Sequence, residues 1–315
     1  METVVENPDN VKLSLAQLNI ESTIELEDIF EKHDRSCLIL LNQRISIERE
    51  VLFKLWEANT IHVCADGGAN RLYEFFNNDG LRAKYIPTYI VGDMDSLNPE
   101  VKNYYEARGT IVVVQETQYA NDFMKSTTIT SLHFNLPALP KILQSKNYDL
   151  VNGIDKIFNE ARRLSWDDEP IHMVVLNAIE GRFDQTIQSI AQLYRLARDH
   201  KYFKVSYITP NDMILLLPAN GVWLSFTSNF RDEILGNCGI LPLAGSCTLR
   251  STKGLKWDVT NWNTSILGGK ISSSNRFVGE DGCYINSDTD IIMSVELKSD
   301  GLRKWFGSSK ISLGI

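Results

Sequence analysis

Residues 60–65 read Thr60-Ile-His-Val-Cys-Ala65, and this run ends abruptly at Asp66-Gly67-Gly68. A short, largely apolar run is typical of a strand that is buried on both faces of a parallel sheet. The next residues, 69–76, carry a helical pattern, so the stretch predicts a strand joined to a helix by an acidic glycine turn. The same order of strand, turn and helix recurs along the first two thirds of the chain.

Apolar or β-branched runs predict further strands, and helical patterns lie between them. The strands are expected at 37–41, 87–91, 111–114, 171–176 and 203–208, and the helices at 47–58, 98–107, from about 122, and at 184–198. Strands that alternate with helices indicate a parallel sheet covered on both faces. Residues 134–170 interrupt this order with prolines and one plausible helix at 152–164, so we expect a surface insertion there.

The pattern changes near Pro210. Residues 211–315 are rich in glycine and show no helical period before the last residues, and the runs 213–217 and 222–226 predict a hairpin. Many short strands separated by turns favour a sandwich or small barrel. We therefore predict an acidic lead-in (1–33) with one short helix, a Rossmann-like α/β parallel-sheet domain (34–210), and an all-β sandwich domain (211–315).

Composition excludes several classes of protein. The 315 residues are 43% hydrophobic and 23% charged, as in globular proteins, and 32 basic against 40 acidic residues give a net charge of −8. This charge argues against a general nucleic-acid or membrane-surface binder. No run approaches the roughly 20 apolar residues of a spanning helix, and we expect no signal peptide. Five scattered cysteines without a Cys-x-x-Cys pair suit a cytoplasmic protein.

Acidic residues follow several predicted strands: Asp66, then Asp93 and Asp95, then Asp122. The carboxyl ends of parallel strands meet at one edge of a sheet, where ligands bind. Converging carboxylates repel one another unless a cation lies between them, and such hard oxygen ligands select Mg²⁺. An aspartate after a strand is more often a helix cap or turn residue. All four at equivalent junctions nevertheless favour a magnesium site.

Groups that could bind phosphate lie beside these acids. Gly67 and Gly68 would let backbone N–H groups approach a phosphate at a helix N-terminus, although they form neither a G-x-G-x-x-G fingerprint nor a Walker A loop. Lys125 lies three residues after Asp122, and Arg182 precedes a predicted helix. Either cation could stabilise charge on a phosphoryl group, and each taken alone could equally be a solvated surface charge.

Several motifs occur together and in order: Cys64-Ala-Asp-Gly-Gly-Ala-Asn-Arg-Leu72, Gly92-Asp-Met-Asp-Ser96, Asn121-Asp-Phe-Met-Lys125, Gly181-Arg-Phe-Asp-Gln185, Gly254-Leu-Lys-Trp257 and Ser272-Ser-Ser-Asn275. The set closely resembles the thiamin pyrophosphokinases, from about residue 37 to the end. Met94 stands where an aromatic is usual and Asn121 where Thr is usual, but neither change removes a carboxylate.

This resemblance implies an α/β nucleotide domain and a β-sandwich that binds thiamin, in a homodimer with thiamin at the subunit interface. It also implies transfer of the β,γ-pyrophosphoryl group of ATP to the thiamin hydroxyl, which gives thiamin diphosphate and AMP. The residues that it assigns fall into three groups. They are Asp66, Asp93, Asp95 and Asp122 for Mg²⁺, the last three acting with Lys125 in catalysis; Asp66, Gly67, Gly68, Asn70, Arg182, Asp184 and Gln185 for ATP; and Trp257, Ser274 and Asn275 for thiamin.

Two other functions fit parts of the sequence. A Mg²⁺-dependent phosphohydrolase could use Asp93-x-Asp95, but such enzymes carry this motif after the first strand of the core, and the other motifs would be unexplained. A nucleotide- or thiamin-binding regulatory protein could share the fold, but loss of an acid would be expected there. Without the resemblance, Trp257 could equally be a core or rim tryptophan.

Overall fold

The computed structural model of the protein describes residues 1–164 and 166–307. It divides into two compact units. The α/β unit comprises Lys32–Ile47 and Leu55–Thr209, and the β unit comprises Met1–Glu31, Glu48–Lys54 and the chain from Pro210 onward. The expected lead-in therefore lies in the same compact unit as the C-terminal strands.

Six parallel strands form the sheet of the α/β unit, in the order β8-β7-β3-β4-β5-β6. Because the order reverses between β3 and β7, the carboxyl edge of the sheet has the topological switch at which ligands bind in open α/β folds. The strands are β3 (Ser36–Leu40), β4 (Ile61–Ala65), β5 (Tyr89–Gly92), β6 (Ile111–Val114), β7 (Ile171–Leu176) and β8 (Phe203–Ile208).

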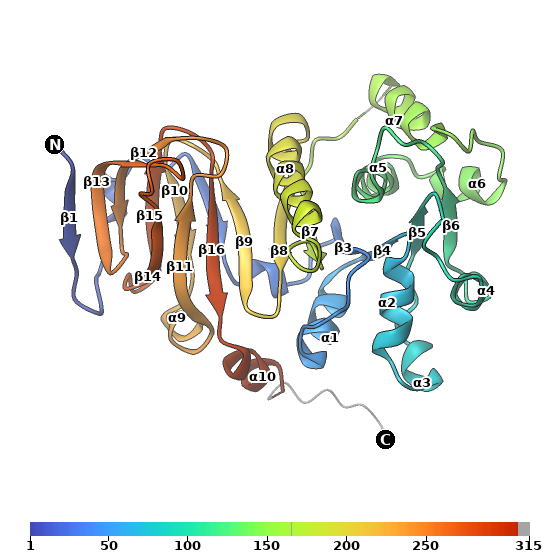
Figure 1. Ribbon diagram of the computed structural model, residues 1–315, viewed down its shortest axis with the longest axis horizontal. Helices are drawn as coiled ribbons and strands as arrows, with labels where there is room; N and C mark the ends of the chain where they lie inside the picture. The colour runs from blue at the N-terminus through green and yellow to red at the C-terminus, as the bar shows by residue number, and fades with distance from the viewer. Residues whose placement is uncertain (165, 308–315) are drawn as a thin grey trace. The chain divides into compact units, whose positions relative to one another are not determined.

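Helices lie on both sides of this sheet (Figure 1), as its apolar strands require. α2 contacts β3 and β4, α5 contacts β4 and β5, and α8 contacts β8. These elements confirm the predicted alternation of strands and helices. The helices are α2 (Gly68–Phe75), α3 (Asp79–Arg82), α4 (Pro99–Glu106), α5 (Asp122–Asn135), α6 (Leu139–Gln144), α7 (Gly153–Leu164) and α8 (Phe183–Asp199); the residues of α1 (Arg49–Ala58) are divided between the two units.

The insertion at 134–170 is more than a surface loop. It contains the expected α7 and also α6, which the prolines concealed because Pro140 lies in the first turn, where a missing N–H costs nothing. Leu139, Leu143 and Ile154 are buried, and both helices contact α5. The segment therefore contributes to the core of the α/β unit.

The β unit contains two sheets. One has the order β1-β13-β12-β15-β10-β2, and the other contains β14-β11-β16-β9. All pairs are antiparallel except β10 with β2. The strands are β1 (Thr3–Glu6), β2 (Ser22–Glu25), β9 (Asp212–Leu217), β10 (Val222–Ser225), β11 (Leu235–Leu241), β12 (Cys247–Lys253), β13 (Trp257–Thr264), β14 (Ser272–Arg276), β15 (Gly282–Ser287) and β16 (Ile291–Leu297).

Three expectations for this unit are wrong. β9 and β10 form no hairpin, since β9 pairs with β16 whereas β10 pairs with β15 and β2. Both runs are strongly apolar, so each can be buried in a different sheet after the turn between them. Residues 1–31 supply β1, β2 and two 3-10 helices in place of one short helix. The unit also contains α9 (Ser228–Ile234), capped by the Thr227 side chain, where no helix was expected. α10 (Ser299–Gly307) agrees with the prediction, which allowed a helix in the last residues.

Within the described ranges, no helix is long and apolar enough to cross a membrane. All five cysteines are buried and none is in a disulfide.

Candidate active site

Three of the predicted acids meet at the carboxyl edge of the sheet. Asp66 follows β4, Asp93 follows β5 and Asp122 is the first residue of α5, and one oxygen of each lies within 4.8 Å of the other two. Gly92 permits this approach, since a Cβ there would lie 2.6 Å from the Asp66 Cβ and 3.2 Å from Asp122 Oδ1. We call Asp66, Asp93 and Asp122 the carboxylate cluster.

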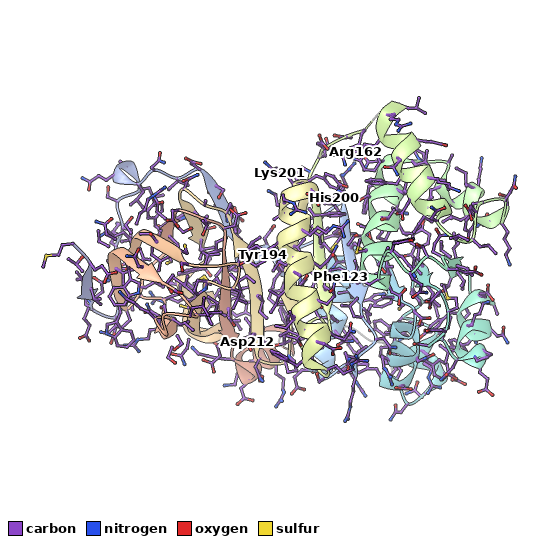
Figure 2. All side chains as sticks on the ribbon, turned by 45° about the horizontal axis from the view of Figure 1, so that its top comes forward. Phe123, Arg162, Tyr194, His200, Lys201 and Asp212 are labelled. Carbon is purple, nitrogen blue, oxygen red and sulfur yellow. The ribbon has the colours of Figure 1, made fainter. Side chains whose placement is uncertain are left out.

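Backbone geometry holds two positions of this region in uncommon conformations. Asp66 has a φ of 43° and Met94, between Asp93 and Asp95, has a φ of 69°. Non-glycine residues rarely adopt this left-handed region, and such strain concentrates at functional sites. α5 is anchored next to the cluster by the buried Phe123, which is labelled in Figure 2. Its ring packs on that of Tyr207 with centroids 6.0 Å apart.

Burial and repulsion shift the acidities of the cluster. Burial, together with repulsion from Asp122, raises the pKa of Asp66 to about 6, although the Ser96 N–H donates to Oδ2 over 3.0 Å. Burial also raises the pKa of Asp122, although Lys125 opposes this change. Burial would raise the pKa of Asp93 too, but hydrogen bonds, led by that from Gln118, lower it overall.

The cluster fits a divalent cation. Asp66 is only 2% exposed, and its Oδ1 is buried without a hydrogen-bond partner. A buried carboxylate oxygen without a partner is costly, and three converging carboxylates repel one another, so a hard cation between them would relieve both penalties. Asp95 is not one of these three, but it lies beside them. It is exposed, its side chain accepts from Ser96 Oγ over 2.9 Å, its backbone N–H donates to Asp93 Oδ1, and its carboxylate helps to raise the pKa of both Asp66 and Asp122.

Lys125 is the cation closest in sequence to the cluster, and the structure places it there. Its side chain is 3% exposed, and Nζ donates to Asp122 Oδ1 over 3.0 Å. A lysine is almost never buried to this extent without a charged partner. The spacing of three residues in the sequence thus places Lys125 and Asp122 on one face of α5, where they form an ion pair.

The glycine turn supports the site through close packing. A Cβ on Gly68 would lie 2.3 Å from the Leu40 carbonyl oxygen, so only glycine lets α2 approach β3 so closely. Asn70 donates through Nδ2 to the Ser96 carbonyl over 2.7 Å and accepts from the Asn98 N–H over 3.0 Å. Both ends of its amide are used to fix the loop after β5, although the sequence assigned it to the nucleotide.

The second basic motif lies at the start of α8. Arg182 is exposed, and its guanidinium donates through Nε and Nη2 to the carboxylate of Asp184, over 3.1 and 2.5 Å. This pairing lowers the pKa of Asp184. Gln185 donates its backbone N–H to the same carboxylate over 3.1 Å. Because α8 follows β7, these three residues lie at the carboxyl edge of the sheet.

The residues assigned to thiamin lie in the β unit. Trp257 and Asn275 line a cavity of about 200 Å³, together with Ser273, Val4 and other side chains from both sheets. Asn275 holds the backbone of Trp257 through two hydrogen bonds of 3.1 and 2.9 Å. Trp257 remains 43% exposed. Ser274 does not line this cavity, and its φ of 59° turns the strand at this point.

Sequence reasoning missed Gln118. Its Nε2 donates to Asp93 Oδ2 over 3.1 Å, and it is the largest influence that lowers the pKa of that carboxyl. It lies four residues before Asp122 in a predicted strand-to-helix loop, where a glutamine has no distinctive pattern. Asn42, which follows β3 and accepts from Arg71 Nε over 3.0 Å, also went unnoticed.

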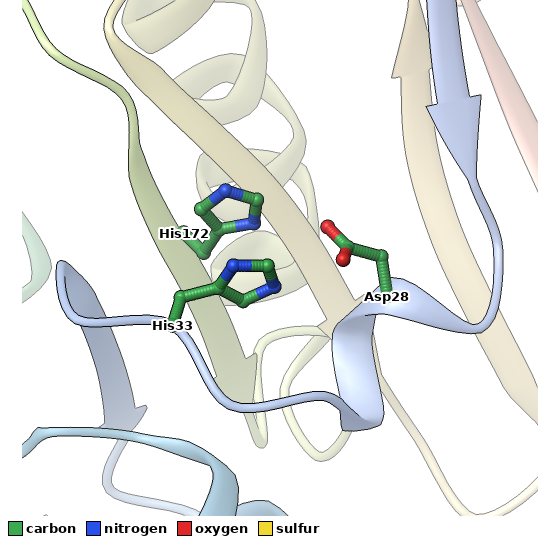
Figure 3. Close-up of side chains that lie close together, drawn as sticks. All are labelled: Asp28, His33 and His172. Atoms are coloured by element: carbon green, nitrogen blue, oxygen red, sulfur yellow. The ribbon is translucent and has the colours of Figure 1, made fainter.

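A pair of histidines lies elsewhere in the same unit. His33 and His172 stack with ring centroids 3.6 Å apart and planes at 7° (Figure 3). His172 is near the start of β7 and His33 precedes β3, so the pair lies at the amino edge of the sheet. It is therefore at the opposite edge from the carboxylate cluster.

The profile of the thiamin pyrophosphokinase catalytic domain matches residues 52–205, and that of the vitamin B1 binding domain matches residues 229–292. Thiamine pyrophosphokinase of Saccharomyces cerevisiae is 40% identical over 313 residues, which cover 96% of this chain and 98% of the yeast protein. The chain belongs to the thiamin pyrophosphokinase family.

Solved structures agree with this membership. The structure of yeast thiamin pyrophosphokinase superposes with a TM-score of 0.90 at 42% identity, covering 95% of this chain and 98% of that one. The enzyme from Candida albicans superposes with a TM-score of 0.83 at 40% identity, covering 95% and 99%. The resemblance inferred from the ordered motifs is thus confirmed, and this thiamin pyrophosphokinase family member is an enzyme.

Proposed function

We propose that this enzyme transfers the pyrophosphoryl group of ATP to the hydroxyl of thiamin in a Mg²⁺-dependent reaction that yields thiamin diphosphate and AMP. The observation that carries the proposal is the carboxylate cluster beside the buried Lys125, in a chain of this family. Family membership also disfavours the phosphohydrolase and the regulatory binder.

The carboxylate cluster and the nearby basic residues would have different roles in this reaction. Asp66, Asp93 and Asp122 would hold Mg²⁺, which when bound neutralises charge on the phosphate oxygens. Lys125 sits at the same edge, where its ammonium would stabilise charge that develops on the transferred group. Arg182 can exchange its exposed contact with Asp184 for a phosphate of the nucleotide, because a solvent-exposed ion pair contributes little stability.

The acceptor is proposed to bind in the β unit. Thiamin is a flat cation, and the face of Trp257 would attract it by about 0.5–2 kcal/mol. Because Trp257 is 43% exposed in a single chain, we propose that a second copy covers it and that thiamin lies at the interface of a homodimer. Asp122 is the candidate to accept the hydroxyl proton, since burial raises the pKa of its carboxyl.

The test is a product analysis with purified protein, ATP, thiamin and Mg²⁺. We expect AMP and thiamin diphosphate in a one-to-one ratio. The Asp122→Asn variant should lose this activity, whereas Asp168→Asn, which makes the same change on an exposed carboxylate of the same unit, should retain it. Formation of ADP and thiamin monophosphate would mean attack at the γ-phosphorus and would refute the proposal.

A further inference from the structure

Gln115 is a fully buried residue that links the strand β6 to the inserted segment. Its Oε1 accepts from the Ile154 N–H over 3.0 Å, and its Nε2 donates to the Asp149 carbonyl over 3.1 Å and to the Val114 carbonyl. A buried amide that uses both ends on another segment fixes that segment, because leaving either end unpaired costs about 1–3 kcal/mol.

Backbone hydrogen bonds extend this contact. Glu116 donates its N–H to the Leu150 carbonyl over 2.7 Å, and Thr117 donates to the Val151 carbonyl over 2.9 Å. Residues 149–154 of the insertion therefore run alongside residues 115–117, which begin the loop between β6 and α5. We call residues 115–121 the β6–α5 loop.

The other part of this loop reaches the carboxylate cluster. Gln118, one residue beyond the last of these contacts, donates to Asp93 Oδ2 over 3.1 Å. Asn121 then caps α5 by accepting from the Met124 N–H over 2.8 Å, so that Asp122 opens the helix. One short loop thus joins the insertion to two of the three carboxylates.

A second contact joins the insertion to α5. Asp155, in the first turn of α7, is half-buried, and Thr128 Oγ1 lies 3.4 Å from its Oδ1. Thr128 is on the turn of α5 that follows Lys125. Burial raises the pKa of Asp155, and the hydrogen bond from Thr128 and the charge of Lys125 oppose this rise only in part. The insertion therefore meets both the β6–α5 loop and the helix that carries Asp122 and Lys125.

We propose that the inserted segment is a positioning element of the active site, which through Gln115 holds the β6–α5 loop so that Gln118 orients Asp93 toward a divalent cation. The proposal rests on the proposed function for the identity of the reaction, but not for the binding of the cation. Groups that orient a metal-ligating carboxylate affect metal affinity by about 10–100-fold. Gln115 is fully buried, and its role is therefore to hold the loop.

The experiment measures Mn²⁺ binding to the full chain without nucleotide, together with kcat and KM. Gln115→Met keeps the size of the side chain but removes its hydrogen bonds with residues 149 and 154. We expect Mn²⁺ affinity to fall about tenfold and kcat to fall with it. The matched control is Asn59→Leu, which also removes a buried amide, one that donates to the Leu55 carbonyl over 2.7 Å. It should leave Mn²⁺ affinity unchanged.

A double variant distinguishes positioning from a general loss of structure. If Gln115 acts through Gln118, the Gln115→Met/Gln118→Leu protein should bind Mn²⁺ no more weakly than Gln118→Leu alone. Additive losses, or unchanged affinity in folded Gln115→Met, would overturn the proposal. If Gln115→Met does not fold, the exposed Gln118→Leu alone should lower Mn²⁺ affinity about tenfold, and unchanged affinity there would overturn the proposal equally.

The two proposals can fail separately. A wild-type protein that binds Mn²⁺ but forms no thiamin diphosphate would refute the proposed reaction and leave the role of the insertion standing. A protein that forms thiamin diphosphate while Gln115→Met binds Mn²⁺ normally would refute the role of the insertion alone.

Discussion

Replacing Asp66 by asparagine should stabilise the protein when no divalent cation is present. The folded chain raises the pKa of Asp66 from 3.8 to about 6, chiefly by burial. The folded state therefore binds this proton more tightly than the unfolded state does, and the wild type loses stability as pH rises from about 4 to about 6. Asparagine has no charge to desolvate, and its Oδ1 can still accept the Ser96 N–H.

The magnitude follows from the shift. A pKa difference of about 2 units corresponds to about 3 kcal/mol, which is fully expressed above pH 6. Asp66→Asn should thus exceed the wild type in free energy of unfolding by up to about 3 kcal/mol at pH 7.5, and by only about 1 kcal/mol at pH 4.5. Addition of Mg²⁺ should reverse the order, because the variant lacks one ligand of the cluster.

The assay is urea unfolding in EDTA between pH 4.5 and 7.5, with Asp168→Asn as the control for an exposed carboxylate. The control should stay within about 0.5 kcal/mol of the wild type at each pH. A variant that is less stable than the wild type at pH 7.5 without metal would refute the reasoning. So would a difference that does not change with pH, because the effect would then not come from ionisation.

Three further predictions concern activity. Asp93→Asn and Asp95→Asn should each lower turnover roughly hundredfold, which corresponds to about 3 kcal/mol. Only the Asp93 variant, which changes the carboxylate cluster, should also weaken Mn²⁺ binding. Normal turnover of both variants at saturating Mg²⁺ would exclude the assignment of these acids to catalysis. Lys125→Ala should reduce kcat more than it weakens ATP binding, because charge stabilisation matters most in the transition state; initial rates and nucleotide titration distinguish the two, and an effect confined to KM would contradict it. If a second copy covers Trp257, dilution should lower specific activity and shift the tryptophan fluorescence to longer wavelength, whereas a fully active monomer in sedimentation would rule out the interface.

The α/β unit could be predicted closely because each of its strands can be recognised from the local sequence. β6 and β8 have the predicted bounds, since β-branched or apolar residues fill runs that are bordered by turns. Parallel strands buried on both faces need no partner-specific pattern, so an apolar run between two helices is sufficient. The order of the acids at the strand ends then follows from the topology.

The β unit was harder to predict because alternation reveals a strand but not its partner. β1 is exposed along its whole length and pairs with β13, more than two hundred residues later in the chain. No local feature of residues 3–6 indicates this contact. The turn between β9 and β10, in contrast, could be predicted from the local sequence. A turn specifies only a change of chain direction, however, and the two strands enter different sheets.

The sequence alone could not predict which of the acids form the carboxylate cluster. Asp93 has an oxygen within 4.8 Å of both Asp66 and Asp122, whereas Asp95, which follows Met94 with its left-handed φ of 69°, is exposed and acts on these carboxylates only as a neighbouring charge. Spacing alone treats the two acids of an Asp-x-Asp motif alike. The dependence of Asp93 on Gln118 was equally hidden, because a glutamine in a loop has no distinctive pattern.

The charges of the cluster explain why a cation and protons should compete for it. Three carboxylates against the single ammonium of Lys125 leave two negative charges at the edge of the sheet. A divalent cation would balance this excess negative charge. Without one, the uncompensated charge in a partly buried site would carry a large desolvation cost. Without a cation, the alternative is protonation, which is favoured at Asp66 because burial and repulsion from Asp122 raise its pKa to about 6. Metal affinity should therefore decline below about pH 6, since bound ligands must be deprotonated. The stability advantage of Asp66→Asn over the wild type should decrease in the same pH range.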